Sequence, residues 1–111
     1  MRIIDTGITK EILSGDNHPQ LKIGDKLYTV DNRQSTWDKI QEIQSMEGLS
    51  EKDRTTKLYE LALGKENAKE IAELDLPVEQ SIYLSYCVTG AIIGEDPKEL
   101  QRIAKEQSRK N

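Results

Sequence analysis

Two residue types that can carry nucleophilic or acid–base chemistry occur once each in this sequence, His18 and Cys87. A cysteine nucleophile needs a base within hydrogen-bond reach. His18 lies between Asn17 and Pro19 in a stretch rich in turn formers, whereas Cys87 lies in the most apolar segment, where a free cysteine usually packs as a small buried hydrophobe. We therefore expect no catalytic dyad and a protein that is not an enzyme.

The carboxylates offer the next possible chemistry, a site for a hard metal ion. Glu66, Glu70 and Glu73 fall at helical spacing on one side. No second cluster of ligands accompanies them, which favours a solvated acidic face instead. A single cysteine excludes an internal disulfide framework, and no Cys and His spacing is typical of zinc. We expect no metal, no organic cofactor and a reducing, cytoplasmic location.

Nucleic acid and membranes are poor candidates for partners. The net charge is −4 and the isoelectric point is about 5.1. Gly64 separates two helical patterns and could mark a helix-turn-helix corner, but the second pattern, residues 65–75, is more acidic than basic and would be repelled by phosphates. The most apolar run, residues 82–93, is 12 residues long, whereas a spanning helix needs about 20.

The elements that must position these residues form one domain, 1–111. We divide it into a loosely defined N-terminal segment at 1–18, which contains both turn formers and a short run compatible with an edge strand, a hairpin at 19–33 and a helical region at 35–108. Only 35% of the 111 residues are hydrophobic and 32% are charged. Such a chain has a thin core, so we expect a partner or self-association.

The hairpin is predicted from two short runs around a turn at residues 24–25. A two-residue loop pairs Ile23 with Lys26 and Leu21 with Tyr28. This register makes one face apolar, with Leu21, Ile23, Tyr28 and Val30. An isolated hairpin of this kind must pack against helices.

Five helices are predicted downstream, and the fold class is α+β, mostly α, with an N-terminal β-hairpin packed on about five helices. Ser35, Ser50 and Pro77 are start signals, and Gly48 and Gly64 are stop signals, Gly64 as a left-handed cap. The last helix opens at residues 96–97. "GAIIG", residues 90–94, has two interpretations: close approach of another helix, or a frayed end in which the first glycine is merely tolerated.

The helix from Val78 to Ile93 is apolar on two sides. Two apolar sides imply two neighbours, the chain's own core and a second surface. The residues that we expect in partner binding or oligomerisation are Ile82, Tyr83, Tyr86, Ile92 and Ile93. A helix buried on all sides within one monomer remains the alternative.

Charge is unevenly distributed along the second half. Residues 66–99 hold eight acidic and two basic residues, while the last twelve hold Arg102, Lys105, Arg109 and Lys110 against Glu106. An acidic band and a basic tail would favour head-to-tail assembly. Ordinary solubilising charge is the more common explanation.

The order of these motifs resembles a known family. The hairpin "LKIGDKLYTV", a Trp-containing helix, "KLYELALGKENAKEI" and "YLSYCVTGAIIGEDPKEL" are similar to the small tail assembly chaperones of long-tailed phages and prophages of Gram-positive hosts. The resemblance covers most of the chain after residue 20 and is strongest at "ELALGKENAKEI" and at the apolar helix that ends in "GEDP". Residues 1–18 have no counterpart.

This resemblance implies a non-enzymatic function in tail morphogenesis. Such chaperones bind the tape-measure protein before the tail tube polymerises around it and help to recruit tail-tube subunits. It also implies a homo-oligomer in the cytoplasm of a bacterial host cell, and the family often makes a longer form by frameshifting. The alternative function is a small regulatory or adaptor protein, antitoxin-like or transcription-associated.

Overall fold

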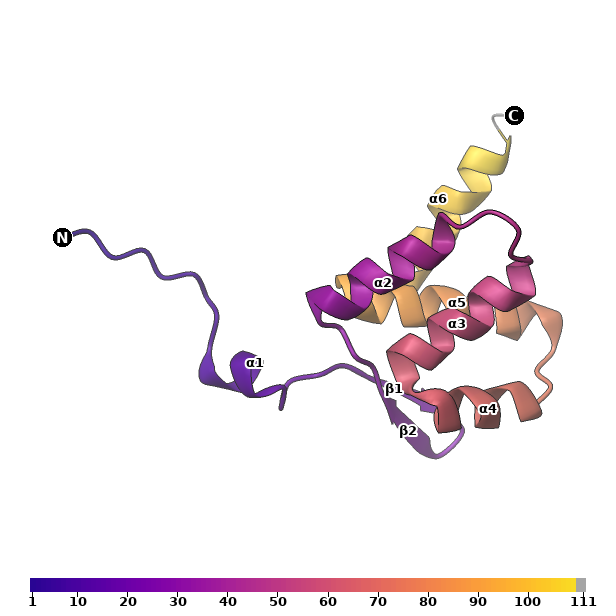
Figure 1. Cartoon of the computed structure of the whole chain (residues 1–111), viewed down its shortest axis with the longest axis horizontal. Coiled ribbons are helices and arrows are strands. Elements are labelled where there is room, and N and C mark those ends of the chain that lie inside the picture. Colours follow the sequence, from indigo (N-terminus) through magenta and orange to yellow (C-terminus); the bar gives the residue numbers. More distant parts are fainter. Residues whose placement is uncertain (110–111) are drawn as a thin grey trace.

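Helices dominate the computed structural model, which describes residues 1–109 (Figure 1). In chain order the elements are α1 (Lys10–Ser14), β1 (Gln20–Ile23), β2 (Lys26–Thr29), α2 (Gln34–Gln44), α3 (Glu51–Leu63), α4 (Lys65–Glu73), α5 (Val78–Ile93) and α6 (Pro97–Arg109). The predicted class, α+β and mostly α with an N-terminal hairpin, is confirmed. Among the described residues, no helix combines the length and the apolar character needed to cross a bilayer.

The hairpin has the predicted register. Ile23 pairs with Lys26 and Leu21 with Tyr28, in an antiparallel two-stranded sheet. On the inner face Tyr28 and Val30 are buried and Leu21 and Ile23 half-buried, whereas Leu27 on the outer face is 55% exposed. Alternation of side chains along a strand produces this difference between the two faces.

Helix α3 occupies the centre of the helical region. It packs against α2, α4 and α5, and α5 in turn contacts β1 and α6. Figure 1 shows α2 and α3 in front of α5, with the hairpin beside α4. The core that these elements enclose consists of Tyr28, Val30, Ile40, Leu58, Tyr59, Ala62, Leu63, Ala68, Ile71, Leu84, Val88 and Ile92.

The start of α2 differs from the prediction. Ser35 lies inside the helix, and the residue at the N-cap is Arg33, whose side chain makes no capping bond. Asp31 takes over this function: its carboxylate accepts hydrogen bonds from the Arg33 backbone N–H at 3.1 Å and from Thr36 Oγ1 at 2.8 Å. The start signal at Ser50 is confirmed, since its hydroxyl accepts from Asp53 N at 3.1 Å and caps α3.

Gly64 joins α3 to α4 in a conformation that the sequence did not predict. Its φ of 93° is positive, as expected, but its ψ of 154° is extended and not left-handed helical. The reason is that one residue ends α3 and caps α4. Its N–H donates to Glu60 O at 3.1 Å, and its carbonyl accepts from Ala68 N at 2.9 Å.

The turn between α5 and α6 gives "GAIIG" a third explanation. Gly94 is left-handed, with φ 78° and ψ 28°, and both its N–H and that of Glu95 donate to Gly90 O, at 2.8 and 3.0 Å. The chain folds back so closely that a Cβ at Gly90 would lie 2.5 Å from Glu95 O. Gly90 is therefore required by the returning backbone, so the interpretation in which it is merely tolerated is wrong.

The N-terminal arm, residues 1–15, runs away from the body of the protein (Figure 1). Residues 1–9 form neither helix nor strand, and the short α1 is capped by Thr9, whose hydroxyl accepts from Ile12 N at 3.3 Å. The arm is attached at its root, where Val30 N donates to Pro19 O at 2.8 Å. None of these arm residues belongs to the core.

Candidate functional site

Helix α5 has one side in the core and one side outside it. Leu84 and Val88 are buried, and Cys87 and Ala91 pack against the core beside them. Burial raises the pKa of the Cys87 thiol above its usual value. This side of α5 therefore contributes to the hydrophobic core.

The opposite side of α5 forms one wall of a groove, which we call the α5–α6 groove. Its volume is about 490 Å³. Apolar and aromatic side chains from four helices line it: Trp37 and Ile40 of α2, Leu58 of α3, Tyr86 of α5, and Leu100, Ile103 and Ala104 of α6. Polar residues complete the lining, among them Ser85, Thr89 and Gln107. The groove is open and large enough to receive several side chains of another molecule.

The structure separates the five residues predicted to bind a partner. Ile82 is 49% and Ile93 40% exposed, and Tyr86 is half-buried in the α5–α6 groove. Tyr83 is also half-buried, on the flank next to Cys87. Ile92 belongs to the monomer core and is only 8% exposed, because it follows Val88 by one helical turn on the inner side.

Most residues of the groove, Trp37 and Ile103 among them, were not predicted as site residues. Both lie on apolar stripes of helices that the sequence predicts, Trp37 on α2 and Ile103 on α6. An apolar stripe on one helix does not say which other helix it faces. In the structure Ile103 remains 39% exposed, so the α6 stripe is only partly covered.

Three charged side chains of α6 pair with one another. Arg102 forms ion pairs with Glu99 and Glu106, the second with 2.6 Å between Nη1 and Oε1. Its guanidinium holds the pKa of Glu99 below the usual value. The predicted basic tail thus has one of its cations already paired, and Lys110 lies outside the described residues.

The predicted acidic face around α4 contains an attachment point for the hairpin. Glu70 accepts from Lys26 Nζ at 2.7 Å and from the Tyr28 hydroxyl at 2.8 Å. The hydrogen bond from Lys26 is the largest cause that lowers the pKa of Glu70, and the hydrogen bond from Tyr28 lowers it further. Within residues 1–109 no three His, Cys, Asp or Glu side chains are grouped closely enough to hold a metal ion.

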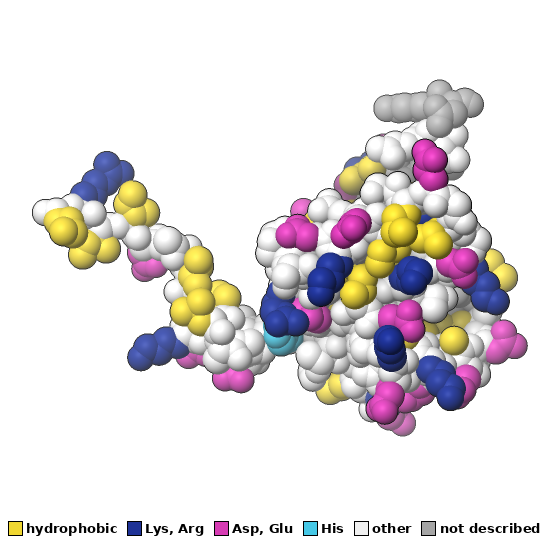
Figure 2. Space-filling view, viewed as in Figure 1, with side chains coloured by type: hydrophobic (Ala, Val, Ile, Leu, Met, Phe, Trp, Pro, Cys, Tyr) yellow, Lys and Arg dark blue, Asp and Glu magenta, His cyan; other side chains and the backbone are white. Residues whose placement is uncertain are grey.

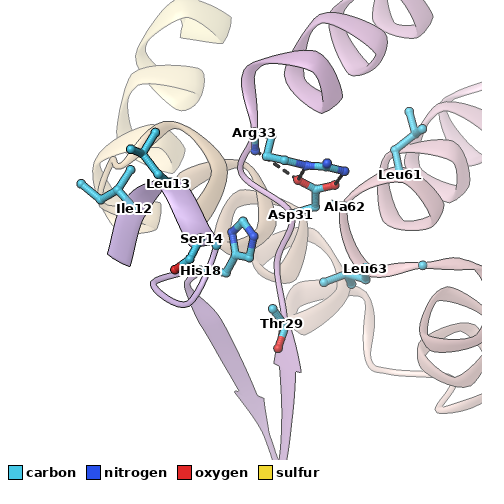
Figure 3. Close-up of a pocket in the computed structure, with 12 residues that line it drawn as sticks. Ile12, Leu13, Ser14, His18, Thr29, Asp31, Arg33, Leu61, Ala62 and Leu63 are labelled. Carbon is cyan, nitrogen blue, oxygen red and sulfur yellow. Dashed lines mark hydrogen bonds and ion pairs between the residues drawn. The ribbon is translucent and has the colours of Figure 1, made fainter. Parts of the chain in front are cut away.

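A second hollow lies between the arm and the body (Figure 3). This root hollow has a volume of about 660 Å³. Ile12 and Leu13 line the arm side, and Leu61, Ala62 and Leu63 of α3 line the body side, with His18, Thr29, Asp31 and Arg33 between them.

The polar side chains in the root hollow have hydrogen-bond partners. Arg33 donates from Nε and Nη2 to the two oxygens of Asp31, at 3.0 and 2.8 Å, and this contact holds the pKa of Asp31 well below its usual range. His18 Nδ1 lies 2.7 Å from Asn32 Oδ1. His18 and Cys87 therefore lie in different parts of the molecule: His18 lines the root hollow at the base of the arm, and Cys87 packs against the core. No family model, curated protein or solved structure matches the chain.

Proposed function

We propose that the protein is a phage tail assembly chaperone that binds the tape-measure protein and helps to recruit tail-tube subunits in the cytoplasm of the bacterial host cell. The observation that carries the proposal is the α5–α6 groove, an open groove between four helices in which apolar and aromatic side chains lie among polar ones. A tape-measure protein is long and mostly helical, so its amphipathic segments present apolar stripes. Helix-in-groove packing is the natural way to cover such a stripe.

The side chains of the groove are those that favour binding to a protein. Trp37 and Tyr86 offer large apolar surfaces with a polar group at one end, a combination enriched at interfaces. Ile82 and Ile93 lie on the same side of α5 and extend the apolar surface beyond the groove. An exposed apolar surface of this kind is typical of an interaction site.

A long partner also explains why many small copies would act together. Repeated stripes on one rod create repeated sites, so several copies bind along it and become neighbours. The exposed carboxylates within residues 66–79, which lie outside the groove, then remain available for tail-tube subunits. In this proposal the groove carries tape-measure binding, and self-association follows from the close spacing of the sites.

Co-expression with the candidate tape-measure protein tests the proposal. The wild-type chain should keep the long protein soluble and co-purify with it. Ile82→Lys and Tyr86→Lys should each weaken this binding at least tenfold, equal to about 1.4 kcal/mol, because each places a charge on the apolar side of α5 that the partner would cover. Leu27→Lys is the matched control, since Leu27 is similarly exposed but lies on the outer face of the hairpin.

Folding must be checked for each variant by circular dichroism, and Ile82→Lys is the decisive one because Ile82 is half exposed. A wild-type chain that fails to solubilise or bind the tape-measure protein would overturn the proposal and support the regulatory or adaptor function. The groove assignment would be wrong if both lysine variants stay folded and bind like the wild type.

A further inference from the structure

The N-terminal arm exposes more large aliphatic side chains than any other short segment of the described chain. Figure 2 shows several groups of apolar side chains along the arm, and on the visible face of the body it shows one apolar group among scattered charges of both signs. The exposed residues are Ile3 (87%), Ile4 (71%), Ile8 (59%), Ile12 (49%) and Leu13 (77%). Single exposed aliphatic residues are ordinary, but five within thirteen residues form an apolar surface of the kind that marks an interaction site.

The arm has local order that fits a docking segment. The Asp5 carboxylate accepts from Gly7 N at 2.8 Å, and Gly7 has the positive φ of 77° that this turn requires. Gly15, with φ 80°, ends α1 in the left-handed conformation. Turns and caps of this kind reduce the number of conformations that must be lost on binding.

The attachment of the arm directs it away from its own body. The bond from Val30 N to Pro19 O and the contact between His18 and Asn32 fix residues 18–19 beside the end of the hairpin. From this point the arm extends away from the folded body (Figure 1). At the same point the root hollow is left open, with apolar walls on both sides and its charged groups already paired.

We propose that the arm of one copy packs into the root hollow of a second copy, and reciprocally, so that two chains form a symmetric dimer. Each copy carries both the apolar segment and the apolar hollow, which is the self-complementarity that a two-fold interface needs. Ile12 and Leu13 line the hollow themselves. In the dimer, the root of each arm lies beside the hollow that receives the other arm. The two arms therefore lie against each other near the two-fold axis, and their tips reach the opposite bodies.

The area available favours a second copy over a foreign partner. A fully buried aliphatic side chain corresponds to about 120 Å² of apolar surface, so the exposed fractions of the five residues give about 400 Å² for each arm. Covering an arm completely requires a receiving surface of similar area, formed by the root hollow together with the body surface around it, so two arms and two such surfaces bury about 1,600 Å² in total, the size of a standard stable interface. One arm on an unrelated partner would bury about 800 Å², the range of weak contacts.

The proposal is independent of tape-measure binding, because the root hollow and the α5–α6 groove share no lining residue. It is tested on the full chain alone by analytical ultracentrifugation. We expect twice the chain mass of 12.6 kDa. In the double variant Ile3→Asp, Ile8→Asp, the dissociation constant of the dimer should be at least 100-fold higher. The circular dichroism spectrum and the melting curve should not change, because both residues are exposed and lie outside the core.

A second variant tests whether the root hollow is the site that receives the arm. Thr29 is exposed and lines the root hollow, so Thr29→Lys should also weaken the dimer without unfolding the protein. Leu27→Asp, two residues away on the same outer face and outside the hollow, is the control and should leave the dimer intact. A monomeric wild-type chain at high micromolar concentration, or a dimer that survives the arm variant, overturns the proposal. Loss of the dimer in the arm variant but not in Thr29→Lys overturns the hollow as the receiving site.

Discussion

A single methyl group at Gly90 tests the turn that places α6 against α5. In the Gly90→Ala variant the new Cβ would lie 2.5 Å from the carbonyl oxygen of Glu95 and 3.5 Å from Pro97 Cδ. The first contact is far inside van der Waals distance and involves backbone. Relief therefore requires the turn itself to move.

Two opposing effects determine the change in the free energy of unfolding. Replacing a helical glycine by alanine stabilises a helix by about 1 kcal/mol. Moving the Glu95 carbonyl disturbs the two hydrogen bonds that Gly90 O accepts, at 2.8 and 3.0 Å, each contributing about 1 kcal/mol, and overpacking costs about 1–3 kcal/mol. The net expectation is a loss of about 1–2 kcal/mol, which lowers the melting temperature by about 4 °C or more.

Urea and thermal denaturation measure this loss, and the fluorescence of Trp37 reports the groove directly because this residue lines it and is the only tryptophan. The emission should shift to the red in Gly90→Ala as α6 moves. Gly94→Ala is the comparison: a Cβ there meets nothing within 4 Å, so only its positive φ opposes the change, at about 1 kcal/mol. A Gly90→Ala protein as stable as the wild type, with unchanged emission, would refute the reasoning.

Two further predictions concern buried or partly buried polar groups. Asp31→Asn should lower the free energy of unfolding by about 1 kcal/mol near neutral pH, because Arg33 and Thr36 lose an anionic acceptor. Since the folded state lowers the pKa of Asp31, its stabilisation is complete above about pH 4 and is lost as the pH falls further; denaturation curves of the two proteins should therefore converge in acid, and a difference that persists there would contradict this account. Tyr59→Phe should be neutral or stabilising by up to about 1 kcal/mol, because burial raises the pKa of Tyr59 to about 12 and its hydroxyl has no partner within the described residues. A loss above that size in urea titrations would show that the hydroxyl is bonded in solution.

The parts of the fold that the sequence predicted depend on local signals. The hairpin register follows from a two-residue turn and from alternation, both contained within eleven residues. The same is true of the α3 start at Ser50, whose cap bond joins neighbouring positions. Such features need no knowledge of where distant segments lie.

The parts that it did not predict depend on distant contacts. Asp31 replaces Ser35 as the capping group because the hairpin delivers its carboxylate to the first turn of α2, and its own N–H is held by Ala62 O at 2.8 Å. The requirement at Gly90 arises only after the chain has turned back at Glu95.

The candidate site shows the same division. Tyr86 was predicted for a partner surface and lies in the groove, but the sequence could not distinguish it from Ile92, because α5 is apolar on nearly every side. Trp37 and Ile103 line the groove only because four helices, α2, α3, α5 and α6, pack around it. Periodicity within one helix carries no information on that packing.

The packing of each helix against its neighbour in the sequence has a consequence for folding speed. Helix α2 packs on α3, α3 on α4, and α5 on α6, so most of the structure forms without closing long loops. Proteins with such local topology fold within about a millisecond, while a ribosome adds on the order of 10 residues per second. Once the last turn of α6 has left the ribosome, we expect the chain to reach its folded state in less time than the synthesis of one further residue takes.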